Sequence, residues 1–89
     1  MCRVLAERNP QRYHQINRSL RIAGHSTSIR LEAAFWGMLD EIADAQGLST
    51  VKLIAALHDE AIELNNGMAN FASVLRTTCL LYAREQASR

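Results

Sequence analysis

The segment Ser26-Thr-Ser-Ile-Arg-Leu-Glu32 decides how the chain folds, because two different periodicities meet at its end. Within it, apolar and polar side chains alternate, which is the pattern of a β-strand with one buried face. The alternation puts Thr27, Ile29 and Leu31 on the buried face and Ser26, Ser28 and Arg30 on the exposed face. After Glu32, apolar residues recur at helical spacing. The sequence therefore predicts a short strand that runs directly into an amphipathic helix.

Three helices are expected after this strand. The first covers roughly residues 32–46 and ends at Gly47, the second roughly residues 50–64 with Ser49 as its N-cap, and the third roughly residues 70–85. Leu80 and Leu81 fall outside the apolar stripe of the third helix, so we expect that helix to be buried on more than one side. The apolar residues expected to form the core are Ile29, Leu31, Phe35, Trp36, Leu39, Ile42, Leu53, Ile54 and Leu57.

Residues 1–25 form a basic segment in which further strands are expected, ahead of the main domain at residues 26–89. Residues 16–22 alternate in the same way as the first segment, and residues 3–6 have strand character before Asn9-Pro10 interrupts them. Gly24-His25 is expected to form the bend that follows. These strands either pair with the edges of the strand at 26–32 or lie across its exposed face.

The charges are divided unevenly along the chain. Residues 1–31 contain six arginines and one glutamate, a net charge of +5, whereas residues 32–89 contain four basic and eight acidic residues, a net charge of −4. The two values sum to the overall net charge of +1. A basic face backed by an acidic body favours orientation toward a polyanion such as double-stranded DNA. The alternative is that the arginines only keep the segment soluble.

Several other functions are disfavoured by the sequence. A chain of 89 residues is enough for one domain, and its apolar runs are too short for a membrane span or a signal peptide. We therefore expect a cytoplasmic protein in which Cys2 and Cys79 are reduced thiols. The neighbours His58, Asp59 and Glu60 point in different directions on a helix, so we expect no metal site, and no cofactor is expected.

The order of strand, helix, glycine-containing turn and helix resembles the ribbon-helix-helix (Arc/MetJ-like) family. The resemblance implies an intertwined homodimer, in which strands from two subunits form an antiparallel ribbon that enters the DNA major groove. A strand at 26–32 with no partner in its own half of the chain fits this arrangement, because an unpaired edge is costly in water. The apolar residues given above are then the dimer core.

The resemblance also assigns the DNA contacts. Side chains of Ser26, Ser28 and Arg30 are expected to read bases, and the helix start at Ser49 and Thr50 is expected to hold a phosphate. From the charge distribution, Arg18 and Arg21 are further candidates for phosphate contact.

A narrower resemblance covers nearly the whole chain. The strings Asn70-Phe-Ala-Ser-Val-Leu-Arg76 and Ser26–Glu32, the opening Met-Cys-Arg and the pair Phe35-Trp36 are similar to a group of small proteobacterial ribbon-helix-helix domain proteins. Members of that group sometimes carry the label aryl-sulfate sulfotransferase. The residues do not support this label, because a glycine-rich phosphosulfate cradle is missing.

The preferred interpretation is a bacterial, sequence-specific DNA-binding transcription regulator, mainly α-helical with a short β-ribbon. It is expected to act as a homodimer or a higher even-numbered oligomer. The alternative is a dimerisation or protein-interaction module with the same fold, because Ser26 and Ser28 are weaker base readers than Asn, Gln or Arg. An enzyme is the least expected class.

Overall fold

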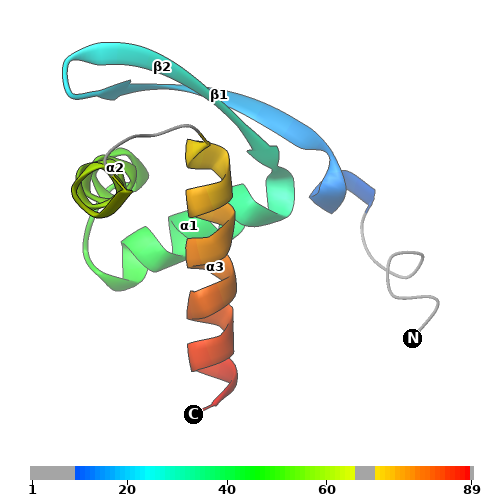
Figure 1. Cartoon of the computed structure of the whole chain (residues 1–89). Helices are drawn as coiled ribbons and strands as arrows, with labels where there is room; N and C mark the ends of the chain where they lie inside the picture. Colours follow the sequence, from blue (N-terminus) through cyan, green and yellow to red (C-terminus); the bar gives the residue numbers. More distant parts are fainter. Residues whose placement is uncertain (1–9, 66–69, 89) are drawn as a thin grey trace.

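A two-stranded β-ribbon lies across three helices in the computed structural model, which describes residues 10–65 and 70–88 (Figure 1). The elements in chain order are the 3₁₀ turn η1 (Pro10–Tyr13), β1 (Gln15–Ile22), β2 (His25–Glu32), α1 (Ala33–Ala45), α2 (Thr50–Asn65) and α3 (Phe71–Ala87). The predicted fold class is confirmed, including the extra C-terminal helix. The strand expected at residues 3–6 lies outside the described residues.

The ribbon is a hairpin formed by one chain. β1 pairs with β2 in antiparallel register, from Gln15 opposite Glu32 to Ile22 opposite His25. The connecting residues Ala23 and Gly24 have positive φ angles of 52° and 81°, which a type I′ hairpin turn requires. The strand predicted at 16–22 is thus present. Pairing of the strand at 26–32 with a second subunit is not needed, because β1 of the same chain pairs with it, which is one of the two placements expected for the strand at 16–22.

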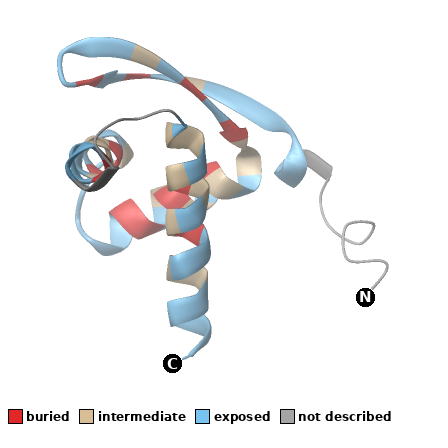
Figure 2. Cartoon of the chain, viewed as in Figure 1, coloured by how far each residue is buried: buried red, intermediate tan, exposed pale blue. Residues whose placement is uncertain are grey.

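Toward the turn in β1 and toward the helices in β2, buried residues alternate with exposed ones (Figure 2). One face of the hairpin is therefore buried and the other is exposed. Leu20, Ile22, Ile29 and Leu31 point toward the helices and are all less than a tenth exposed. The alternation predicted for both strands is therefore confirmed. The apolar face fixes the register, because a slip by one residue would turn this face to solvent.

The helices begin and end close to the predicted positions. α1 begins after Glu32, one residue later than predicted, and Gly47 follows its end with a φ of 70°. The side chain of Ser49 accepts a hydrogen bond from the Lys52 backbone N–H at 3.2 Å, so it caps α2 as expected. Asn70 caps α3 by the same kind of bond to the backbone N–H of Ser73, also at 3.2 Å.

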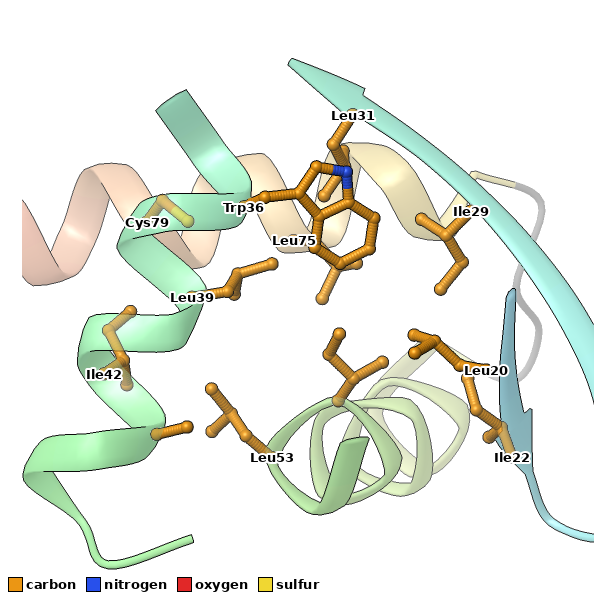
Figure 3. Packing of buried hydrophobic residues seen from close by; sticks show 12 residues of the cluster. Leu20, Ile22, Ile29, Leu31, Trp36, Leu39, Ile42, Leu53, Leu75 and Cys79 are labelled. Carbon is orange, nitrogen blue, oxygen red and sulfur yellow. The ribbon is translucent and has the colours of Figure 1, made fainter. Parts of the chain in front are cut away.

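The core forms where the ribbon and the three helices meet (Figure 3). The largest fully buried side chains are Trp36, Leu31, Leu39, Ile54 and Leu75. All of the predicted core residues belong to this cluster or, like Phe35 and Leu57, are partly buried against it. They pack within a single chain, so the prediction that they form the core of an intertwined dimer is not needed to explain their burial.

α3 is buried on one side only within this chain. Leu75 and Cys79 are buried, whereas Leu80 and Leu81 are each 59% exposed. The second buried side that the sequence predicted is therefore not formed by this chain in the described residues. In residues 10–65 and 70–88, no helix combines the length and the apolar character that crossing a membrane requires.

Candidate nucleic-acid interface

The ribbon face that points away from the helices is a continuous polar surface, which we call the outer face. Ser26, Ser28 and Arg30 of β2 are exposed on it, as the alternation predicted. The register places Arg21 opposite Ser26, Ser19 opposite Ser28 and Asn17 opposite Arg30. The residues of the outer face are therefore Asn17, Ser19, Arg21, Ser26, Ser28 and Arg30, and all six are exposed. Half of this surface comes from β1.

The hydrogen-bond pattern shows that the three residue pairs of the outer face are the ones whose Cα atoms lie closest together across the two strands. The Ala33 backbone N–H donates to the carbonyl of His14 at 2.8 Å, which makes this a hydrogen-bonded position. Hydrogen-bonded and non-hydrogen-bonded pairs alternate along an antiparallel ladder. Counting from His14 along β1, the three pairs of the outer face are non-hydrogen-bonded, and in such pairs the Cα atoms are only about 4.5 Å apart. The side chains of the two strands therefore form a single surface.

The outer face is positively charged. Its six residues include Arg21 and Arg30 and no acidic residue. Among residues 10–65 and 70–88, no acidic side chain pairs with Arg21 or Arg30. Both guanidinium groups are thus available to an external acceptor.

Glu32, at the end of β2, is held by the helices. Its carboxylate accepts hydrogen bonds from Arg76 at 2.9 and 3.3 Å and from the Gln15 side chain at 3.3 Å. The hydrogen bond from Arg76 is the main reason that the pKa of Glu32 lies below its ordinary value. Arg76 therefore links α3 to the end of the ribbon.

Arg18 lies on the opposite face from Arg30 and has a structural role. Its two terminal nitrogens donate to the carboxylate of Asp40 at 3.0 and 3.1 Å, and its guanidinium lies 4.6 Å from the ring centre of Trp36. This placement disfavours the expected contact of Arg18 with phosphate, because Asp40 already binds both terminal nitrogens. The sequence contained a signal for this placement. Arg18 is two residues from Leu20 and four from Ile22 in the same strand, so all three side chains point to the side of the ribbon that faces the helices.

Asp40 connects the ribbon to the start of α2. Besides Arg18, it accepts a hydrogen bond from the Thr50 hydroxyl at 2.7 Å. The hydrogen bonds from Arg18 lower the pKa of Asp40, against a smaller opposing effect of burial. This link was not predicted, because Asp40 is 22 residues from Arg18 and 10 residues from Thr50 along the chain. It fixes Thr50, one of the two predicted phosphate contacts, relative to β1.

Trp36 attaches the ribbon to α1. The indole N–H donates to the carbonyl of Ile16 in β1 at 2.8 Å, while the ring itself is 1% exposed. The sequence identified Trp36 as a core residue but not this bond. The guanidinium of Arg18 packs against the same ring, so two residues of β1 contact Trp36 and fix the position of the ribbon relative to α1.

Other reactive side chains in the described residues form no second site. No group of three His, Cys, Asp or Glu residues gathers where it could hold a metal ion in residues 10–65 and 70–88. His58 packs edge-on against Phe71, with ring centres 5.4 Å apart. Burial raises the pKa of the Cys79 thiol to about 11, so this group is not a nucleophile at neutral pH.

A two-stranded ribbon followed by a helix, a glycine-containing turn and a second helix defines a ribbon-helix-helix domain. The chain belongs to the ribbon-helix-helix domain family, whose model matches residues 15–83. The fold is typical of dimeric DNA-binding regulators and is not an enzyme fold.

The structure is similar to that of an uncharacterized protein from Bordetella pertussis Tohama I. The TM-score is 0.91 and the sequence identity 42%, with 99% of this chain and 70% of that chain covered. Among curated proteins, none matches the sequence.

Proposed function

We propose that this protein is a sequence-specific DNA-binding transcription regulator that inserts its β-ribbon into the major groove. The observation that carries the proposal is the exposed outer face, on which Ser26, Ser28 and Arg30 stand clear of the helices. A two-stranded ribbon fits the major groove, where an arginine can bind guanine through two hydrogen bonds. Serine hydroxyls donate to or accept from either kind of base edge.

The start of α2 is the proposed phosphate contact. The first N–H groups of a helix lack carbonyl partners within it, and the positive end of the helix dipole favours an anion. Ser49 caps this turn and Thr50 is tied to Asp40, so the turn is held firmly relative to the ribbon. A rigid phosphate contact beside the ribbon would set its register on the duplex.

We also propose that the protein acts as a homodimer or a higher even-numbered oligomer. Support comes from apolar side chains that the chain leaves exposed, chiefly Leu80 and Leu81 at 59% each. Leu81 borders a groove of about 550 Å³ between α1, α2 and α3, which is lined mainly by apolar side chains. Sedimentation at micromolar concentration measures the assembly. A monomer at all concentrations would remove the dimer while leaving the hairpin ribbon intact.

The proposal implies a protein that works in the cytoplasm, without catalysis and without a cofactor. Its test is retention of a random-sequence duplex pool at low and at physiological salt. Phosphate neutralisation dominates such binding, so we expect retention to fall steeply as salt rises. Arg30→Ala should weaken binding of the preferred sequence by about 1–3 kcal/mol. Arg84→Ala, on the part of α3 far from the ribbon, should leave that binding unchanged (Figure 1).

One result would contradict the proposal. If no duplex is retained even at low salt, the protein is better described as a dimerisation or protein-interaction module. The exposed Leu80 and Leu81 would then be the first surface to examine for that role.

A further inference from the structure

We propose that one chain supplies both strands of the DNA-reading ribbon, so that Asn17 and Arg21 of β1 contact base edges together with Arg30 of β2. The inference rests on the proposed function and identifies residues that determine its specificity. In the Arc and MetJ arrangement, each subunit contributes one strand of the ribbon. Here β1 takes the position of the second strand, because it pairs with β2 along its full length.

The dimensions of the hairpin suit the major groove. Two paired strands are about 4.8 Å apart, and the groove is about 12 Å wide. Outward-facing residues recur about 6.7 Å apart along a strand, which corresponds to about two base-pair steps of 3.4 Å. The pair Asn17 and Arg30 is separated by four residues along β1 from the pair Arg21 and Ser26. The outer face therefore spans about four base pairs.

The side chains of β1 are better suited to base reading than the serines of β2. Arginine binds O6 and N7 of guanine, and asparagine binds N6 and N7 of adenine, each through two hydrogen bonds. Arg21 and Arg30 occupy diagonally opposite corners of the outer face, on different strands. Between them, Ser19 and Ser28 are short, so the ribbon can approach the base pairs closely.

The environment of the arginines supports this assignment. Arg18 and Arg76 are neutralised by Asp40 and Glu32. Arg18 lies on the side of the ribbon that faces the helices, and Glu32, which shares the parity of Arg30, is held by Arg76 of α3 at the end of β2. Among residues 10–65 and 70–88, Arg21 and Arg30 have no such partner and are exposed. The fold thus pairs the arginines that attach the ribbon to the helices and leaves free those that face outward. Arg21, which charge distribution alone assigned to phosphate, is accordingly placed among the base readers.

The test is selection of preferred sequences from a random duplex pool with the full-length protein and four variants. The variants are Asn17→Ala, Arg21→Ala, Arg30→Ala and the control Arg84→Ala. We expect the wild-type preference to include two guanines about four base pairs apart, one lost in Arg21→Ala and the other in Arg30→Ala. Asn17→Ala should lose preference at a third position. Each loss should be roughly fivefold to hundredfold against the wrong base, and Arg84→Ala should keep the full preference.

The outcomes separate this inference from the proposed function. If the wild type selects a sequence and Arg30→Ala alters it while Asn17→Ala and Arg21→Ala do not, the inference is overturned and β2 alone reads bases. Uniform weakening of all sequences by Arg21→Ala would also overturn it, since that is the signature of a phosphate contact. If the wild type binds no duplex at low salt, the proposed function fails as well. Thermal melting of each variant, expected to match the wild type, confirms that the fold is retained.

Discussion

Replacing Leu31 with alanine tests how the ribbon is held to the helices. The Leu31 side chain is 0% exposed, and it packs in the cluster that includes Trp36 and Leu75. Full burial of a leucine contributes about 1.5–3 kcal/mol through removal from water. The cavity left by truncation adds to the loss, and Leu→Ala changes in cores cost about 2–5 kcal/mol. A ribbon strand at the edge of the core can settle partly into the space, so we expect a loss of about 2–4 kcal/mol.

This loss is large enough to measure by circular dichroism. For a domain of this size, 1 kcal/mol changes the melting temperature by about 4–8 °C, so a loss of about 2–4 kcal/mol in Leu31→Ala should lower Tm by roughly 8–32 °C. The matched control is Arg30→Ala, the adjacent residue on the exposed face, for which the change should stay within about 0.5 kcal/mol. If Arg30→Ala lowers Tm more than Leu31→Ala, the assignment of the two faces is reversed.

A second control separates core packing from assembly. Leu80→Ala removes the same atoms from a side chain that is 59% exposed. If Leu80 lies in a subunit interface, its truncation should lower Tm in a manner that depends on protein concentration. Leu31→Ala should instead lower Tm by a similar amount at every concentration. Equal effects of both truncations at all concentrations would refute the packing argument.

The remaining predictions concern an ion pair, a turn and a thiol. Asp40→Asn should cost about 1 kcal/mol, because the ion pair with Arg18 is partly exposed and screened by solvent. The pKa of Asp40 is below its ordinary value of 3.8, so its carboxylate stabilises the fold above that pH, and this contribution is lost as the pH falls through the lower folded value. Urea titrations at pH 7 and pH 3 should therefore show a smaller difference between wild type and Asp40→Asn in acid. Ala23→Asn should stabilise the hairpin by about 0.5–1 kcal/mol, because asparagine tolerates a positive φ of 52° better than alanine does; a lower Tm would contradict this. With a pKa of about 11, Cys79 should resist iodoacetamide at pH 8 until the protein unfolds, as peptide mass mapping would show.

The strand and helix boundaries were predictable because each depended on local pattern. Alternation through Leu31 and helical spacing from Phe35 place the change of structure within a few residues of its observed position. The caps Ser49 and Asn70 are equally local, since each hydrogen bond joins residues three apart. The pairing of β1 with β2 was harder to predict, because Ala-Gly is a weak signal for a hairpin turn compared with Asn-Gly or Asp-Gly.

The long-range contacts were not predictable from pattern alone. The partners Arg18 and Asp40 are 22 residues apart, and Arg76 and Glu32 are 44 residues apart. Nothing in the local sequence indicates which charged residues will meet once the helices pack. Arg18 is an example. The charge distribution predicted that it contacts DNA, whereas the alternation in β1 predicted that it faces the helices. In the structure it packs against Trp36 and so faces the helices.

The position of Trp36 gives the protein an intrinsic optical reporter. It is the single tryptophan of the chain, and it touches the ribbon through both its N–H group and its ring face. Lifting the ribbon from α1 would bring the indole into water and shift its fluorescence emission to longer wavelength. A molecule bound to the outer face would leave the indole covered. The emission of unlabelled protein therefore distinguishes opening of the ribbon from occupation of its surface.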